Sequence, residues 1–63
     1  MNIEQLNKAI EIEYTLVGAY NLRMATETPA ERRQTHELVN SAYLRIEAFA
    51  ERIKRMTETQ AKK

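Results

Sequence analysis

The chain has 63 residues with no cysteine, one glycine and one proline, and its ten basic and nine acidic side chains leave a formal net charge of +1. This length allows one small domain, residues 1–63, which is marginally stable unless something else holds it. The lack of cysteine excludes disulfides and zinc–thiolate sites. The near-neutral charge argues against strong non-specific binding to nucleic acid.

The N-terminal residues M-N-I-E-Q-L-N-K contain Glu4 and no apolar run, which is unlike a secretory signal peptide. No stretch approaches the ~20 apolar residues that a membrane-spanning helix needs. We therefore expect a cytoplasmic protein that has no membrane partner.

A first helix is predicted over about residues 3–25. Asn2 is a suitable N-cap, and Gln5 three residues later completes a weaker capping box. On a helical wheel this segment has one broad apolar arc. The arc consists of Ile3, Leu6, Ala9, Ile10, Tyr14, Leu16, Val17, Tyr20 and Met24, and it is widened by Ile12 and Ala19.

Glu13 lies near the centre of this apolar arc, between Leu6 and Tyr20 on the wheel. An unpaired buried carboxylate is costly, so we expect Glu13 to have a partner or to hold its proton. With equal rise along both helices, Glu13 faces the level of Ser41, and Arg45 lies one turn away. The preferred interpretation is a buried Glu13–Arg45 pair, within one hairpin or between two, which can fix register and partner choice.

A metal site or a catalytic carboxylate is the alternative interpretation of Glu13. Di-iron helical bundles combine inward glutamates with Glu-x-x-His motifs, but the single histidine, His36, follows Arg33 by three residues. Acid–base catalysis needs a second group and a substrate pocket, and no second inward carboxylate is evident. We therefore expect no metal, no cofactor and no enzymatic activity.

Gly18 interrupts the first helix, where glycine costs ~1 kcal/mol relative to alanine. It points away from the main arc, so either another helix or a ligand approaches the backbone there, or a surface glycine is tolerated. Tyr14, Tyr20 and Tyr43 lie near the borders of the apolar arcs. They are either core-edge residues with wet hydroxyls or a stacking platform for a base.

The stretch T-P-A-E at residues 28–31 marks the start of a second helix. Thr28 suits the N-cap, Pro29 suits the first helical position, and Glu31 suits the capping box. We predict this helix over about residues 29–57, after a hinge at residues 26–28, with a frayed polar tail at residues 58–63. Such a short connection makes the two helices antiparallel neighbours.

The second helix has its own apolar arc, formed by Leu38, Val39, Ala42, Tyr43, Ile46, Phe49, Ala50, Ile53 and Met56. Arcs this wide exceed what one partner helix can cover, and exposed apolar patches usually mark interfaces. We therefore predict an all-α fold, an antiparallel two-helix hairpin that self-associates into a helical bundle. A four-helix dimer is the simplest closure, and a trimer of hairpins or a larger assembly is the alternative.

Three arginines gather around the hinge, namely Arg23, Arg32 and Arg33. They lie beside the positive end of a helix dipole, an arrangement typical of anion or phosphate sites. The alternative is that they are solvated and pair with nearby glutamates such as Glu27 and Glu31. The candidate ligand-binding residues are therefore Tyr14, Gly18, Tyr20, Arg23, Arg32 and Arg33.

The segment E-R-R-Q-T-H-E-L-V-N-S-A, about a fifth of the chain, resembles part of a helical-hairpin domain. That domain occurs in phage anti-defence proteins that sequester cyclic-nucleotide immune signals. The shared features are a proline before an acidic–basic pair, a leucine and a small alanine, here Pro29, Glu31, Arg32, Leu38 and Ala42. The longer signature around the alanine differs here. The resemblance implies an oligomer without catalysis that holds its ligand between subunits, with arginines on phosphates and an aromatic on a base.

The main functional prediction is thus a non-enzymatic, homo-oligomeric binding protein that sequesters a small anionic, cyclic-nucleotide-like ligand in phage counter-defence. The first alternative is a protein–protein interaction, adaptor or assembly module. The second is an RNA-binding four-helix bundle, suggested by the basic C-terminal end of the second helix and by the border tyrosines. Its architecture is similar to that of the plasmid-copy-control RNA-binding bundle, but no sequence match supports it, and fold alone does not carry function.

Overall fold

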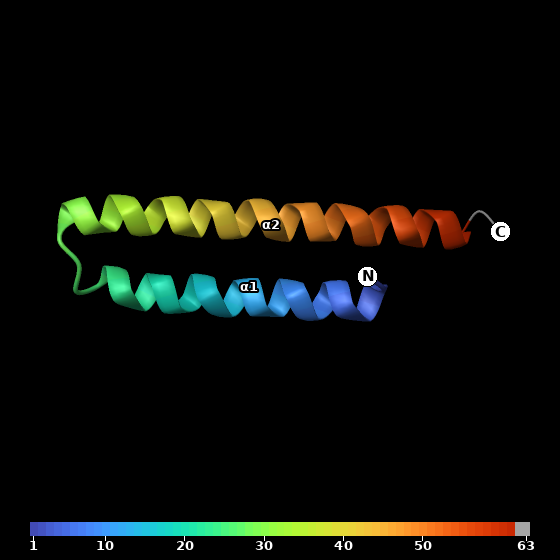
Figure 1. Cartoon of the computed structure of the whole chain (residues 1–63), viewed down its shortest axis with the longest axis horizontal. Coiled ribbons are helices and arrows are strands. Elements are labelled where there is room, and N and C mark those ends of the chain that lie inside the picture. The colour runs from blue at the N-terminus through green and yellow to red at the C-terminus, as the bar shows by residue number, and fades with distance from the viewer. Residues whose placement is uncertain (62–63) are drawn as a thin grey trace.

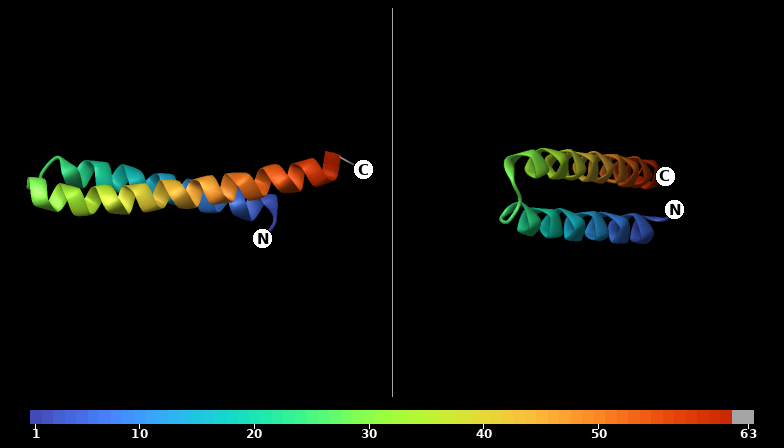
Figure 2. Two further views of the ribbon diagram at one scale, coloured as in Figure 1. Left: turned by 90° about the horizontal axis from the view of Figure 1, so that it is seen from above. Right: turned by 60° about the vertical axis from the view of Figure 1, so that its left-hand side comes forward.

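The computed structural model describes residues 1–61, with side chains described as far as Thr59. It is an antiparallel helical hairpin, and its described part contains no strand (Figure 1). Helix α1 covers Ile3–Met24 and helix α2 covers Pro29–Ala61. The two helices lie side by side in an elongated molecule of 53 × 15 × 14 Å. They cross at a shallow angle when seen from above (Figure 2, left).

Both helices begin with the capping boxes that the sequence predicts. In α1, Gln5 N donates to Asn2 Oδ1 at 2.8 Å, and Asn2 N donates to Gln5 Oε1 at 3.0 Å. In α2, Thr28 N donates to Glu31 Oε1 at 2.9 Å, and Glu31 N donates to Thr28 Oγ1 at 3.3 Å. Each box satisfies two backbone donors that a helix start would otherwise leave without partners.

The C-terminal end of α2 differs from the sequence expectation. The helix continues to Ala61, so residues 58–61 are helical rather than part of a frayed tail, while residues 62–63 of that tail lie outside the described residues. The hydroxyls of Thr57 and Thr59 donate to the carbonyl oxygens of Ile53 and Arg55, each at 2.9 Å. Each hydroxyl thus finds its acceptor four residues back along the helix, a common arrangement for threonine inside a helix.

The contact between the helices is a narrow seam with coiled-coil spacing. Apart from the half-buried Ala9 beside Ile10, its buried and half-buried residues are separated alternately by three and four positions, the spacing that keeps one stripe of each helix facing the other. On α1 and the hinge they are Ile3, Leu6, Ile10, Glu13, Val17, Tyr20, Met24 and Glu27; on α2 they are Thr35, Val39, Ala42, Ile46, Phe49, Ile53 and Met56.

The apolar arcs predicted from the sequence are wider than this seam. The buried apolar residues are Leu6, Val17, Val39, Ala42 and Ile46. Seven members of the predicted arcs lie outside the seam and stay more than a third exposed, namely Ile12, Tyr14, Leu16, Ala19, Leu38, Tyr43 and Ala50. One partner helix therefore covers only part of each apolar surface, because a single neighbour shields a stripe and not a broad arc.

The helices have unequal lengths, 22 residues in α1 and 33 in α2. The C-terminal turns of α2 therefore extend beyond the start of α1 (Figure 1). Within the described part of the chain, neither helix has a stretch apolar and long enough to cross a lipid bilayer.

Candidate functional site

Glu13 forms a bidentate ion pair with Arg45 across the middle of the hairpin. Arg45 Nε donates to Glu13 Oε1 and Arg45 Nη2 donates to Glu13 Oε2, both at 2.9 Å. The side chain of Glu13 is 13% exposed and that of Arg45 is 48% exposed. The two residues thus meet within one hairpin, but the pair is not buried as predicted. The carboxylate is covered while the guanidinium reaches out to solvent.

The same pair favours the cationic form of Arg45 and fixes its orientation. The hydrogen bonds to the Glu13 carboxylate raise the pKa of Arg45 above its ordinary value, and partial desolvation opposes this effect. Arg45 is cationic, as arginine is throughout the pH range in which proteins fold, and a fork of two parallel bonds holds it in one orientation.

The register of the two helices differs from the expected one. Val17 packs with Val39 and Ala42. Given equal rise along both helices, Glu13 then lies about level with residue 44, most of a turn from the Ser41 level predicted from the sequence. The Arg45 side chain consequently reaches the carboxylate without crossing a full helical turn.

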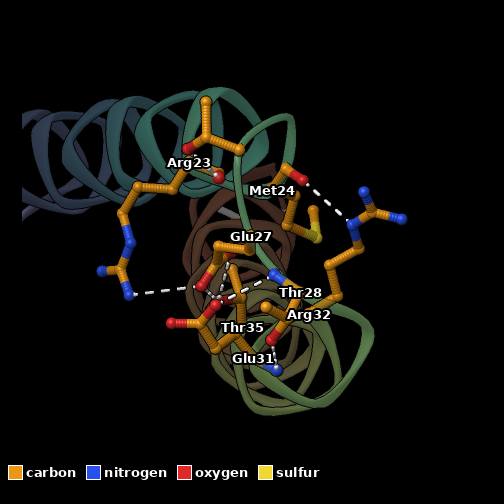
Figure 3. A network of polar contacts seen from close by, with 8 residues as sticks. Arg23, Met24, Glu27, Thr28, Glu31, Arg32 and Thr35 are labelled. Carbon is orange, nitrogen blue, oxygen red and sulfur yellow. Dashed lines mark hydrogen bonds and ion pairs between the residues drawn. The ribbon is translucent and has the colours of Figure 1, made fainter.

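A second polar contact closes the hinge end of the seam (Figure 3). The Thr35 hydroxyl is 2.8 Å from both carboxylate oxygens of Glu27, and Thr35 is only 1% exposed. Arg23 Nη2 lies 3.7 Å from Glu27 Oε2. The Arg23 contact agrees with the alternative that the hinge arginines pair with nearby glutamates such as Glu27. The sequence did not predict a role for Thr35 or the place of Glu27 in the seam. The signal that could have found Glu27 is its spacing from Tyr20 and Met24, which continues the seam.

The hinge arginines do not converge on one site. Arg32 Nε donates to the carbonyl oxygen of Met24 at 3.0 Å, which satisfies an acceptor left free at the end of α1. Arg23 instead lies over the ring of Tyr20, 5.8 Å from the ring centroid, a cation–π geometry. Arg23 and Arg32 point to opposite sides of the hinge (Figure 3), and Arg33 is exposed. Within one hairpin, these predicted ligand-binding residues do not form a common anion pocket.

Glu31, an acidic residue at the start of α2, already has a hydrogen-bond partner in Thr28. The Thr28 backbone N–H, and then the Thr28 side chain, lower the pKa of Glu31 below its ordinary value of 4.5, with a smaller contribution from the charge of Arg23. Glu31 therefore carries its charge at neutral pH and uses one oxygen to cap α2.

Gly18 and Tyr14 lie outside the seam. A side chain added at Gly18 would meet nothing within 4 Å, so no part of the described hairpin approaches its backbone. Tyr14 is more than half exposed, whereas Tyr20 lies in the seam and is half-buried. The predicted ligand-binding set is therefore divided between the seam, the hinge and an open side of the hairpin.

The seam leaves two lateral surfaces, which differ in chemistry. Residues 16, 38 and 45 each directly precede a seam residue, and they lie on one side of the hairpin. Residues 14 and 43 each directly follow a seam residue, and they lie on the other side. Residues before the seam of α1 share a side with those before the seam of α2 because both helices are right-handed and run antiparallel. We call the first side the aliphatic flank, which carries Ile12, Leu16, Ala19 and Leu38 and, on α2, the half-exposed Arg45. We call the second side the tyrosine flank, which carries Tyr14, Gly18 and Tyr43.

Comparison with known protein families, curated proteins and solved structures gave no match to this chain. The resemblance of residues 31–42 to the phage hairpin domain therefore stays a prediction. Among the described residues, no three or more His, Asp or Glu side chains gather in a group that could hold a metal ion. The features that remain to be explained are the exposed apolar flanks and the paired glutamates of the seam.

Proposed function

We propose that the chain is a non-enzymatic self-association module, a hairpin whose apolar flanks dock on further copies of itself. One observation carries this proposal. Among the described residues, eight large apolar side chains are at least a third exposed, five of them on the two flanks, whereas the apolar side chains that are buried number five. Soluble monomers rarely expose apolar surface on this scale without a partner. Self-association supplies the missing burial without requiring a second gene product.

Capture of a small anionic ligand, which the sequence analysis predicted, is compatible with this proposal but ranks behind it. Arg32 and Glu31 already serve as helix caps in the single hairpin. Arg23 and Arg33 remain exposed. A phosphate site would therefore need a second copy to complete it, so self-association comes first in either case. Binding of RNA, an adaptor role, and the cytoplasmic location stay predictions.

Sedimentation equilibrium over a wide range of protein concentration tests the proposal. We expect the mass to reach a discrete multiple of the 7.4 kDa chain. The melting temperature followed by far-UV circular dichroism should rise with concentration, because association stabilises only the folded chain. A folded monomer whose melting temperature is independent of concentration would contradict the proposal. Native mass spectrometry of the same sample reports any retained ligand.

A further inference from the structure

We infer that the aliphatic flank is the contact between two copies of this chain, which meet face to face and antiparallel about a twofold axis that passes beside Leu16. This inference rests on the proposed self-association and adds to it the surface, the relative direction and the central residue. The tyrosine flank and the outward-facing Leu22 and Leu44 lie outside this contact.

The accessible area of the hairpin is the first argument for a second copy. A compact monomer of 7.4 kDa exposes about 4,200 Å². This chain exposes 5038 Å², an excess of roughly 800 Å² over that value. A stable interface of standard size buries about 800 Å² on each partner. One further copy on one flank would therefore bring the hairpin to the burial expected of a folded protein.

The chemistry of the two flanks decides which one is covered. On the aliphatic flank, Ile12 is 62% exposed, Leu38 is 44% exposed and Leu16 is 37% exposed. These side chains have no polar group that water could satisfy, so each gains from burial. Tyr14 and Tyr43 on the other flank each carry a hydroxyl that is well placed in water. The aliphatic flank therefore has the larger driving force for association.

The order of side-chain sizes along α1 fits a second copy running in the opposite direction. Ile12 lies four residues before Leu16, and Ala19 lies three residues after it. A twofold axis beside Leu16 places Leu16 against its own copy. The same rotation places Ile12 of one chain beside Ala19 of the other. Large side chains then meet small ones on both sides of the axis, which permits close packing.

Charge on α2 supports the same arrangement. Leu16 is about level with Ser41, since Val17 packs between Val39 and Ala42. Arg52 lies eleven positions after Ser41 and Glu31 lies ten positions before it. Both are on the aliphatic side, so the rotation brings Arg52 of one copy to Glu31 of the other. It also brings Arg45 of one copy beside Leu38 of the other, where the guanidinium stays bound to Glu13 of its own chain. Arg52 forms no ion pair with any residue that the structure describes.

An arrangement with both hinges at the same end lacks the pairing of Arg52 with Glu31 and of large with small side chains. If two hairpins met through the same flank with their hinges together, α1 of one copy would lie on α2 of the other. Leu16 would then face Ser41, and Arg52 would face the uncharged Gln5. Opposite charges and complementary sizes therefore favour the antiparallel arrangement.

Single cysteines test the arrangement cleanly, because the natural chain contains none. We expect Leu16→Cys to form a disulfide-linked dimer under mild oxidation, since its two copies meet at the axis. Ile12→Cys alone should not cross-link, because its copies are about 12 Å apart along the helix, beyond the reach of a disulfide. A mixture of Ile12→Cys with Ala19→Cys should form the mixed dimer. Tyr14→Cys and Leu44→Cys are matched controls on the uncovered surfaces.

A second pair of variants measures affinity without cross-linking. Leu16→Glu should weaken dimerisation by about tenfold or more in sedimentation, as expected for a central interface residue. Leu44→Glu makes the same chemical change on the outer surface and should leave dimerisation unchanged. Both positions are exposed in the single hairpin, so circular dichroism at high concentration should show folded helices in each variant.

The results separate this inference from the proposed function. A natural protein that sediments as a monomer overturns both. An oligomer that cross-links through Tyr14→Cys and not through Leu16→Cys overturns the inference and leaves self-association standing. An oligomer in which Leu16→Cys cross-links only with Ser41→Cys overturns the antiparallel direction. Cross-linking of Leu16→Cys to itself, together with the Ile12→Cys and Ala19→Cys mixed dimer, is the result we expect.

Discussion

Two glutamates occupy seam positions of this hairpin, and they are paired in different ways. Glu27 at the hinge has two local partners, the hydroxyl of Thr35 eight residues away at 2.8 Å and the more distant Arg23 four residues away at 3.7 Å. Glu13 at the middle accepts two bonds from the charged Arg45, 32 residues away. Their carboxylates are covered to a similar degree, so the difference lies in the partner and in the distance along the chain.

That difference indicates separate roles for the two contacts. The Glu27–Thr35 contact involves only the hinge and the second turn of α2, so it forms whenever the turn has its native shape. The Glu13–Arg45 pair forms only when α1 and α2 are in the correct register. Polar groups at coiled-coil seam positions are known to specify register at some cost in stability. We therefore expect the hinge contact to stabilise the turn and the central pair to select the alignment.

The largest effect is expected when the central pair loses its arginine. Arg45→Leu leaves the covered Glu13 carboxylate without a donor, and the melting temperature should fall by roughly 10 °C. Arg55→Leu is the matched control, because Arg55 pairs with Glu51 on the exposed surface and its loss should change little. Thermal unfolding followed by circular dichroism measures both. Equal melting temperatures for the two variants would remove any special role of the central pair.

At the hinge, Thr35→Val keeps the shape of a buried side chain and removes its hydroxyl. The Glu27 carboxylate then loses its nearest donor, so we expect a loss of about 2 kcal/mol in unfolding free energy by urea denaturation. Thr35→Ser keeps the hydroxyl and should cost less. If the serine variant were the less stable of the two, the methyl group of Thr35 and not its hydrogen bond would be the stabilising feature.

The capping box of α2 should contribute less than either seam contact. Thr28→Ala removes the hydroxyl that accepts from Glu31 N, and such cap losses cost about 1 kcal/mol. Urea denaturation of the natural chain and this variant, under identical conditions, measures the difference. Thr26→Ala is a control in the same hinge, because the Thr26 hydroxyl donates to a carbonyl within α1 rather than capping α2.

The cap should also make stability depend on pH in a defined direction. The folded-state pKa of Glu31 lies below its ordinary value of 4.5. The ionised Glu31 carboxylate therefore contributes fully to the free energy of unfolding above the unfolded-state pKa. This contribution is lost as the pH falls through the lower folded-state pKa. The difference in melting temperature between the natural chain and Glu31→Gln should shrink as the pH is lowered below 4.5. A difference that is constant with pH would mean that the ionised carboxylate does not matter.

Local signals explain how much of the fold the sequence could predict. Thr28, Pro29 and Glu31 define the start of α2 through backbone donors within one turn, and the structure confirms the hairpin and both capping boxes. The end of α2 was placed too early, because polar composition alone does not distinguish a frayed tail from the last turns of a helix. Termini depend on weak contacts more than helix starts do.

The candidate site was less predictable, for a reason that lies in the hinge. A helical wheel reports which residues share a face, but not which part of that face a neighbour covers. That part depends on the register between the helices, which a wheel does not contain and which the Arg32–Met24 and Thr35–Glu27 contacts at the hinge accompany. A shift of a few residues in the register of α1 against α2 moves Glu13 from the level of Ser41 toward Arg45. The pairing partner was foreseeable by charge, but its exposure was not.

The smallest change in stability, and the sharpest test of register selection, is expected from Glu13→Leu. The substitution makes the centre of the seam continuously apolar between Ile10 and Val17, while Arg45 is half-exposed and can turn to solvent. Replacing a paired charge by an apolar side chain is commonly neutral or stabilising, so the melting temperature should stay equal or rise. Specificity should fall, because apolar seams tolerate several alignments and oligomers.

Native mass spectrometry and amide NMR spectra distinguish these two consequences. We expect Glu13→Leu to give more than one oligomer or more than one set of amide resonances, and to weaken the selectivity of Leu16→Cys cross-linking. Glu11→Leu removes the same charge from an exposed position of α1 and should leave a single species. If both variants stay uniform, the hinge contacts alone fix the register, and the central pair is then an ordinary half-exposed ion pair. If Glu13→Leu alone becomes heterogeneous, the carboxylate in the apolar stripe is retained because it excludes wrong alignments.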